Sequence, residues 1–230
     1  MNASSNRSPA ELARPRRGRP PKTPEQRADG NRRQDLINAA ARLFRQKGFD
    51  ATSTRDIAAA VGMRSGSPFY HFDSKQALLV AVMEDGMQSA LRWLESRMSE
   101  AQREGANDEQ LLRTMVRAHM DVLWGDHRDF IPVMLQEWQV LSAEQRRGIA
   151  ELKDAYEAHW NPVLARLIAQ GRLRAEVTMA RLMLFGAMNW TLKWYDPSGR
   201  VSLDDWTDQL VALVLQQPRD SAPSPAIRQA

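Results

Sequence analysis

The segment TRDIAAAVGMRSGSPFYHFDSKQALL, residues 54–79, decides the fold that we expect for this chain. Two short helix-forming stretches meet at Gly62, where a glycine permits the tight turn that two steeply crossing helices need. Ser53 and Asp56 have the spacing of a capping box at the start of the first stretch. The second stretch, near 65–72, is polar at its start, as suits a helix that enters the major groove of DNA. The segment therefore predicts a helix-turn-helix.

The rest of the chain shows helical periodicity and no convincing alternation of apolar and polar residues. Before the motif, 32–47 carries apolar residues on one face and is followed by Gly48, which can cap a helix in the left-handed conformation. After the motif, Ser74 begins a helix that we expect to reach about Ser99. Further helices are predicted near 108–124, 127–141, 144–170, 177–195 and 203–216. The predicted fold class is all-α.

The helix-turn-helix segment resembles a known family. Residues 54–79, together with LINAAARLFRQKGFDATS at 36–53, resemble the DNA-binding motif of the TetR (tetracycline repressor) family. The resemblance implies an N-terminal three-helix DNA-binding domain and a C-terminal helical domain that binds an effector and dimerises. The predicted parts are a disordered basic arm (1–30), the helix-turn-helix domain (31–79), the effector-binding and dimerisation domain (80–217) and a disordered tail (218–230).

The resemblance also implies which residues contact DNA. Those at the start of the first motif helix would meet phosphates or base edges: Thr52, Ser53, Thr54 and Arg55. Those of the recognition helix and of the next helix start would contact bases and backbone: Arg64, Ser65, Ser67, Tyr70, His71 and Lys75. Pro68 departs from the family, which usually has an aliphatic residue there, so the recognition helix is expected to begin late.

Basic charge is concentrated before the motif. Residues 1–33 contain nine Lys or Arg and three acidic residues, a net charge of +6, whereas the whole chain has a net charge of +4. This asymmetry favours a polyanion partner at the N-terminal end. Within it, RRGRPPK at 16–22 looks like an AT-hook, in which Arg17 and Arg19 would lie in a narrow minor groove. A merely solubilising tail is the alternative.

Composition argues against several other classes of protein. The chain has no cysteine, which excludes disulfides, iron–sulfur clusters and thiol nucleophiles. No signal peptide and no apolar run of membrane-spanning length is visible, so we expect a cytoplasmic protein without a membrane partner. His119, His127 and His159 are too widely spaced to predict a metal site, and no nucleophile–base pair or phosphate loop is recognisable. We therefore expect no cofactor, no metal and no enzymatic activity.

The last two predicted helices carry broad apolar stripes. One stripe comprises Ala180, Met183, Leu184, Ala187, Thr191 and Trp194, and the other comprises Leu203, Trp206, Leu210 and Leu213. Such helices need more burial than one neighbour supplies, and pairing with the same helices of a second copy would provide it. We predict a homodimer through these helices, with ordinary core inside one chain as the alternative.

Large soft and aromatic side chains of the C-terminal part suit an apolar pocket. We predict that an effector contacts Met120, Trp124, Phe130, Met134, Trp138, Trp160 and Asn189, although each could be ordinary core. AMNWTLKWYDPSG, residues 187–199, resembles a helix of TetR-type repressors of sterol and fatty-acid catabolism that respond to acyl-CoA thioesters. This resemblance implies an acyl-CoA-like effector, whose phosphate or carboxylate groups would meet Arg113, Arg117, Arg128 or Arg181.

These patterns together predict a ligand-gated repressor. A homodimer would bind double-stranded operator DNA, and a small hydrophobic or acyl-CoA-like effector would release it. The second hypothesis is a DNA-binding or architectural regulator that acts without a ligand, through the basic arm.

Overall fold

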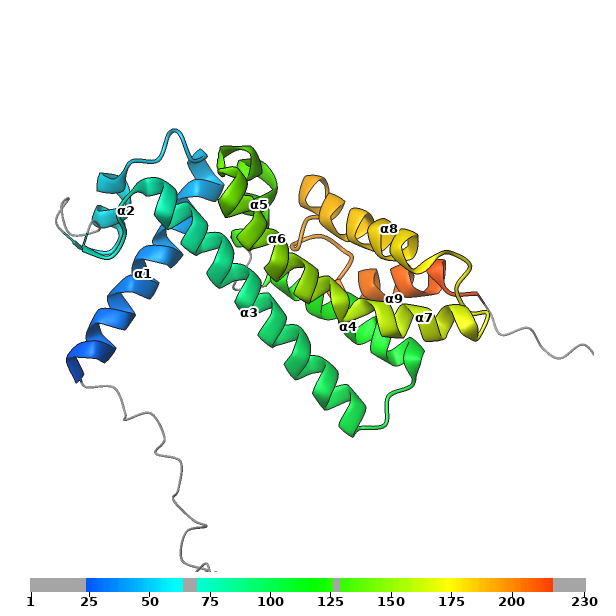
Figure 1. Ribbon diagram of the computed structural model, residues 1–230. Helices are drawn as coiled ribbons and strands as arrows, with labels where there is room; N and C mark the ends of the chain where they lie inside the picture. Colours follow the sequence, from blue (N-terminus) through cyan, green and yellow to red (C-terminus); the bar gives the residue numbers. More distant parts are fainter. Residues whose placement is uncertain (1–23, 64–69, 126–128, 217–230) are drawn as a thin grey trace, which may run out of the picture.

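The computed structural model describes residues 24–63, 70–125 and 129–216, and every regular element in these ranges is helical (Figure 1). The predicted all-α fold is confirmed. The elements are α1 (Pro24–Lys47), α2 (Thr54–Ala60), α3 (Lys75–Arg103), α4 (Asp108–Trp124), α5 (Phe130–Glu137), η3 (Trp138–Val140), α6 (Ala143–Ala158), α7 (Trp160–Ala169), α8 (Val177–Trp190), η4 (Thr191–Lys193) and α9 (Leu203–Val214). The predicted contact residues Arg17, Arg19, Arg64, Ser65, Ser67 and Arg128 lie outside the described ranges.

The first helix begins earlier than its apolar pattern indicated. Its first residue is Pro24 instead of Arg32, so residues 24–30 of the segment predicted as a disordered arm are helical. Proline suits the first position of a helix, because the N–H that it lacks would have no partner there. The apolar face predicted for this stretch is buried, with Leu36 and Phe44 fully inaccessible, and it packs α1 against α3.

A single long helix, α3, joins the two halves of the molecule. The Ser74 hydroxyl caps it by accepting the N–H of Ala77 at 3.0 Å, and the helix then continues to Arg103. It packs against α1 in the N-terminal half and against α4, α5 and α6 in the C-terminal half (Figure 1). The domain boundary predicted after residue 79 therefore falls inside a continuous helix whose buried face belongs to both halves.

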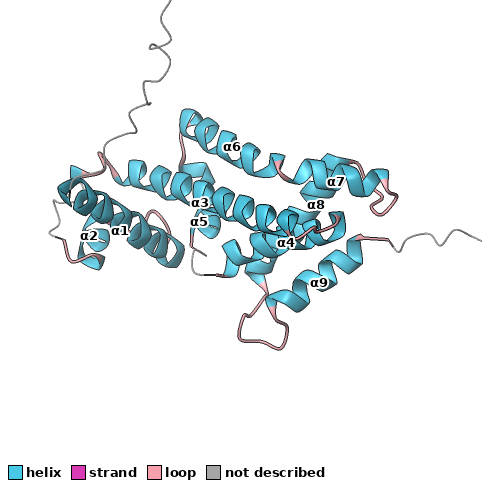
Figure 2. Ribbon diagram, turned by 90° about the horizontal axis from the view of Figure 1, so that it is seen from below, coloured by secondary structure: helices cyan, strands magenta, loops and turns pink. Residues whose placement is uncertain are grey.

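The C-terminal half is built around the α3–α4 pair. Helix α6 lies along α3 and α9 lies along α4, on opposite sides of the pair, while α7 and α8 pack on each other and on α4 (Figure 2). None of the helices within the described ranges combines the length and the apolar character that crossing a membrane requires.

The helix predicted over 144–170 is broken at His159, which is a correction. Helix α6 ends at Ala158 and α7 begins at Trp160. Pro162 explains the break, because its ring has no N–H to donate and would clash with the carbonyl of Ala158 in an uninterrupted helix. The helix predicted over 177–195 is also shorter than expected, since α8 gives way at Thr191 to the 3-10 turn η4.

Helix α5 approaches α3 very closely at a glycine. The ring of Phe130, the first residue of α5, lies over Gly86 in α3. A Cβ atom at position 86 would lie 2.1 Å from Cγ of Phe130, a separation that real structures do not show. The missing side chain of Gly86 is therefore what permits this contact between the two helices.

Gly86→Ala is expected to destabilise the protein by about 1–3 kcal/mol, because Phe130 must turn away or the helices must separate. Gly148→Ala in α6 is the matched control, since a Cβ there meets nothing within 4 Å. The control should gain roughly 0.5–1 kcal/mol from the better helix propensity of alanine. Urea unfolding followed by circular dichroism measures both, and a Gly86→Ala protein as stable as the control would contradict the contact.

Candidate DNA interface and effector site

The start of α2 is fixed by the predicted capping box, which the structure confirms. The Ser53 hydroxyl accepts the N–H of Asp56 at 3.1 Å, and the Asp56 carboxylate accepts the N–H of Ser53 at 2.9 Å. These bonds from Ser53 lower the pKa of Asp56, the backbone N–H contributing most. Ile57 is buried as the anchor of α2, which leaves Ser53 and Arg55 exposed on its outer face.

The predicted DNA-contacting residues that the structure describes differ in exposure. Tyr70 is 82% exposed and its ring meets that of His71 edge to face, with centroids 5.2 Å apart. His71 and Thr54 are half-buried. An exposed, large aromatic side chain next to the helix-turn-helix has no packing role, so Tyr70 is available to a partner.

Thr52 does not lie where the family resemblance placed it. Its side chain is buried, with 1% of its surface exposed, and its hydroxyl donates to the carbonyl oxygen of Gly48 at 2.8 Å. The hydroxyl therefore fastens the turn between α1 and α2 from inside and cannot reach a phosphate. The motif gave the position of this threonine along the chain, but not the side of the turn that it faces.

Lys75 is also engaged with the protein. Its ammonium group donates to the carbonyl oxygens of Phe49 at 2.7 Å and Thr52 at 2.9 Å, and lies 4.1 Å from the centre of the Phe49 ring. A third carbonyl oxygen, that of Asp50, lies 3.5 Å away. All three N–H donors of the ammonium group thus face the α1–α2 turn. The predicted contact of Lys75 with a DNA phosphate would have to compete with these bonds.

Both ends of α5 are tied to the N-terminal half by polar contacts. At its beginning, the Asp129 carboxylate pairs with the Arg45 guanidinium of α1 at 2.9 Å. At its end, the Glu137 carboxylate accepts the N–H of Phe49 at 2.9 Å. The carbonyl oxygen of Phe49 also accepts a hydrogen bond from the Lys75 ammonium group. Helix α5, the α1–α2 turn and the start of α3 therefore form one connected set of contacts.

A polar cluster lies buried in the C-terminal half. His119 lies between the Tyr156 hydroxyl, 3.0 Å from Nδ1, and the Asn189 side-chain oxygen, 3.2 Å from Nε2. Burial lowers the pKa of His119 from 6.5 to about 4, and burial likewise raises the pKa of Tyr156. The neutral ring therefore donates from Nε2 to Asn189 and accepts the Tyr156 hydroxyl at Nδ1. The Phe185 ring covers it, with centroids 4.9 Å apart.

The seven residues predicted to contact an effector differ in burial and in their partners. Met120 and Trp160 are fully buried, and Met134 and Trp138 pack half-buried against the core. The Trp124 indole donates to the Thr191 hydroxyl at 3.0 Å, and Asn189 is bound to His119. Of the seven, only Phe130 lines the large cavity described next.

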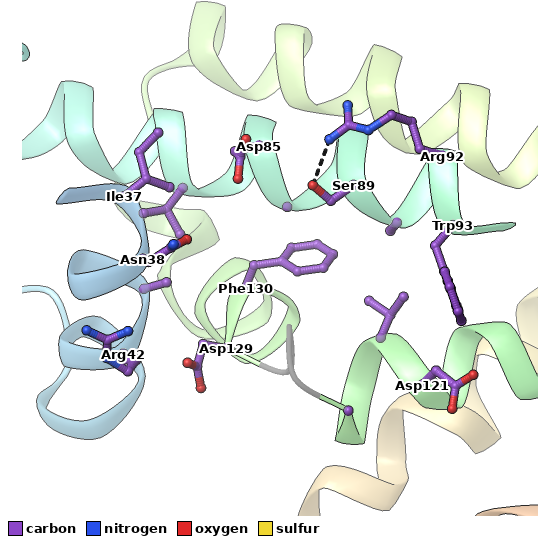
Figure 3. Close-up of a pocket in the computed structure, with 16 residues that line it drawn as sticks. Ile37, Asn38, Arg42, Asp85, Ser89, Arg92, Trp93, Asp121, Asp129 and Phe130 are labelled. Carbon is purple, nitrogen blue, oxygen red and sulfur yellow. Dashed lines mark hydrogen bonds between the residues drawn. The ribbon is translucent and has the colours of Figure 1, made fainter. Parts of the chain in front are cut away.

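This cavity has a volume of about 810 Å³ and lies between α1, α3, α4 and α5 (Figure 3). Its apolar walls include Ile37, Val82, Trp93, Val122 and Phe130. Its polar lining residues are Asn38, Arg42, Asp85, Ser89, Arg92, Asp121 and Asp129. Sequence periodicity gives the inward face of each helix but not which helix it meets, so the sequence offered no signal for this grouping.

Of the four arginines predicted to meet an anionic effector, the three that the structure describes already have acidic partners. Arg113 pairs with Asp208 and Asp204, Arg117 with Asp121 at 3.0 Å and Asp204 at 2.5 Å, and Arg181 with Glu157 at 3.2 Å. The pairs with Asp204 and Asp208 hold α4 to α9, and the pair with Glu157 holds α6 to α8. Two arginines of the cavity differ: within the described part of the chain, neither Arg42 nor Arg92 has an acidic partner, and Arg92 donates to the Ser89 hydroxyl at 2.9 Å.

Sequence comparison identifies both halves of the chain. Residues 36–82 match the family described as bacterial regulatory proteins, tetR family, and residues 105–217 match the tetracyclin repressor-like C-terminal domain. The chain belongs to the TetR family of transcriptional regulators. The family resemblance seen in the helix-turn-helix segment is confirmed.

Similar proteins cover most of this TetR-family chain. Over 199 residues it is 27% identical to the HTH-type transcriptional repressor KstR2 of Rhodococcus jostii (strain RHA1), covering 85% of this chain and 95% of that protein. The structure of the superantigen PfiT is 34% identical with a TM-score of 0.69, covering 80% and 96% of the two chains. AibR, solved in complex with isovaleryl coenzyme A and operator DNA, is 27% identical with a TM-score of 0.71, covering 80% and 97%.

The buried His119 makes the stability of the protein depend on pH. Above pH 6.5 the ring is neutral whether the chain is folded or unfolded, whereas between pH 6.5 and about 4 only the unfolded chain takes up the proton. The free energy of unfolding should therefore fall by about 3 kcal/mol from this group as the pH decreases through that range.

Urea unfolding of wild type and His119→Gln at several pH values between 7.5 and 4 measures this effect. The variant should be less stable near pH 7 and should lose less stability on acidification than the wild type does. Equal losses in the two proteins would show that His119 is not the titrating group.

Proposed function

We propose that this TetR-family protein is a homodimeric repressor that binds operator DNA and is released by a hydrophobic or acyl-CoA-like effector. The observation that carries the proposal is Tyr70, an aromatic side chain left 82% exposed beside the capped helix α2, whose own outer face presents Ser53 and Arg55. Such a polar and aromatic surface suits the major groove. The matched relatives support it, since one is named a transcriptional repressor and another was solved with both isovaleryl coenzyme A and operator DNA.

The exposed surface of α8 supports dimerisation. Of the predicted stripe, Ala180, Leu184 and Thr191 are buried within the chain, which is a correction, whereas Met183, Ala187 and Trp194 are exposed. The exposed apolar positions form a stripe at helical spacing: Met179, Leu182, Met183, Gly186, Ala187, Trp190 and Trp194. On α9, Leu210 is buried while Leu213 is 82% exposed. Apolar residues repeated on one exposed face favour self-association about a two-fold axis.

The repressor mechanism follows from the symmetry of such a dimer. Two recognition segments would enter successive major grooves, about 34–36 Å apart. An effector that binds better to a conformation with another spacing would shift the population away from the DNA-bound form. A regulator that acts without a ligand, the second hypothesis, would show no such dependence.

Tyr70→Ala should weaken operator binding by about tenfold or more, a typical effect of losing one contact at a DNA interface. The melting temperature should not change, because the side chain is exposed. Binding to the intergenic DNA beside the gene is measured by fluorescence anisotropy at several salt concentrations, with Glu151→Ala, exposed on α6, as the matched control. The same titration with isovaleryl-CoA present measures release.

Specific binding that exceeds binding to bulk DNA by about a thousandfold, and that weakens in Tyr70→Ala, is the expected result. Equal affinity for any DNA, together with a steep loss on adding salt, would instead favour binding through the basic arm. Specific binding that no acyl-CoA weakens would favour the ligand-independent regulator.

Met183→Glu should convert the dimer to a monomer, because it places a charge in the centre of the exposed α8 stripe. Thr178→Glu, exposed on α8 outside that stripe, should leave the dimer intact. Sedimentation velocity at micromolar concentrations measures both. A Met183→Glu protein that sediments as the wild-type dimer would place the subunit interface elsewhere.

A further inference from the structure

The cavity between α1, α3, α4 and α5 lies where the two halves of the molecule meet (Figure 3). Its volume, about 810 Å³, falls within the range of small-molecule sites. Ile37 and Ala41 contribute the α1 side of the wall, and Phe44 of the same helix packs beside Phe49 of the α1–α2 turn. Whatever fills the cavity therefore touches a helix of the N-terminal half directly.

Two aromatic rings bound the space. The Phe130 ring enters it from the start of α5, over Gly86, and the Trp93 side chain extends from α3 toward α4 (Figure 3). Trp93 is 43% exposed, an unusual position for an indole that only serves packing. An apolar chain would fit along Val82 and Phe130, and a planar ring system would stack on Trp93.

The charges of the lining favour an anion. Asp121 is neutralised by Arg117 and Asp129 by Arg45, each within 3.0 Å. Asp85 accepts a hydrogen bond from Gln34 at 2.8 Å and has no cationic partner among the described residues. Among the lining residues without an oppositely charged partner, two are cationic, Arg42 and Arg92, and one is anionic, Asp85. Guanidinium groups bind phosphate oxygens in bidentate geometry.

We propose that this cavity is the effector site and that it binds an acyl thioester of coenzyme A. The acyl chain lies against Phe130, the adenine ring stacks on Trp93, and the phosphates bind Arg42 and Arg92. This assignment rests on the proposed effector-released repressor and names the place and chemistry of its ligand.

The same cavity supplies a route to the DNA-binding half. Phe130, against whose ring the acyl chain lies, is directly preceded by Asp129, whose carboxylate binds Arg45 of α1. A shift of the start of α5 that makes room for the acyl chain moves Asp129 with Phe130 and so disturbs the Asp129–Arg45 pair. At the other end of α5, the Glu137 bond to the N–H of Phe49 transmits the same shift to the α1–α2 turn. Asp129 and Glu137 are thus positioning residues for release.

Isothermal titration of the full-length dimer with octanoyl-CoA, isovaleryl-CoA and free coenzyme A tests the site. Arg42→Ala and Arg92→Ala should each weaken octanoyl-CoA binding by about tenfold, as the loss of a charge-assisted bond predicts. Ser89→Trp, which fills the cavity, should abolish binding. Arg103→Ala, exposed on α3 outside the cavity, is the matched control and should bind as the wild type does. Free coenzyme A should bind more weakly, because it lacks the acyl chain.

The coupling is tested with Glu137→Ala, because Glu137 binds the α1–α2 turn and does not line the cavity. This variant should bind octanoyl-CoA as tightly as the wild type, but octanoyl-CoA should release it from operator DNA less effectively. The ratio of its operator affinities without and with octanoyl-CoA should be at least about threefold smaller than that of the wild type. A merely structural role for Glu137 would change the melting temperature and leave that ratio intact.

Titrations with operator DNA are carried out in parallel. They distinguish a failure of this cavity assignment from a failure of the proposed repressor function. Octanoyl-CoA binding that is unchanged in Ser89→Trp and both arginine variants would overturn the cavity assignment and leave an effector-released repressor in place. Absence of acyl-CoA binding to wild type would also overturn it, even if operator binding is specific. Acyl-CoA binding with the expected variant pattern, but without specific operator binding, would support the site and refute the repressor.

Discussion

The structure depends on the continuity of α3. Its 29 residues form one hydrogen-bonded rod of about 43 Å, which begins at the Ser74 cap in the DNA-binding half and ends at Arg103 in the C-terminal half. The buried face of α3 supplies Leu78 and Leu79 near its start and Leu94 and Met98 near its end to one continuous hydrophobic core. Because a helix of this length does not bend freely, the two halves cannot reorient without shifting α3 against its neighbours.

Polar contacts then specify the position of the DNA-binding half on this frame. Lys75, the first residue of α3, binds carbonyl oxygens of the α1–α2 turn, and Glu137 at the end of α5 binds an N–H of the same turn. Apolar packing tolerates small sliding movements, whereas these directional bonds break when the turn moves by about an ångström. The α1–α2 turn is therefore held by α3 and α5, which both contribute residues to the cavity between α1, α3, α4 and α5.

Charged and apolar side chains of the C-terminal half serve different purposes. Arginines of α4 and α8 are neutralised by acidic residues of neighbouring helices and serve the fold, as with Arg117 and Asp204. The exposed surface of α8 carries Met183 and Trp190, each 64% exposed, without charged residues among the positions of its stripe. Arg42 and Arg92, which have no acidic partner among the described residues, lie at the cavity between the two halves. The surfaces proposed for DNA, effector and second subunit are therefore separate.

The sequence by itself determined the all-α class, the helix-turn-helix, the capping box of Ser53 and Asp56 and the family. All of these depend on residues close together in the chain, where capping bonds and helical periodicity act locally. The sequence also contained a signal that our prediction missed, Pro162, which divides the helix expected over 144–170.

Only the tertiary structure decided that Thr52 points inward, that Lys75 binds its own chain and that α8 divides its apolar residues between core and surface. The cavity likewise combines α1, α3, α4 and α5, whose residues are far apart in sequence. Such outcomes depend on which helix faces meet and at what angle, and that is set by packing between distant segments rather than by local hydrogen bonds.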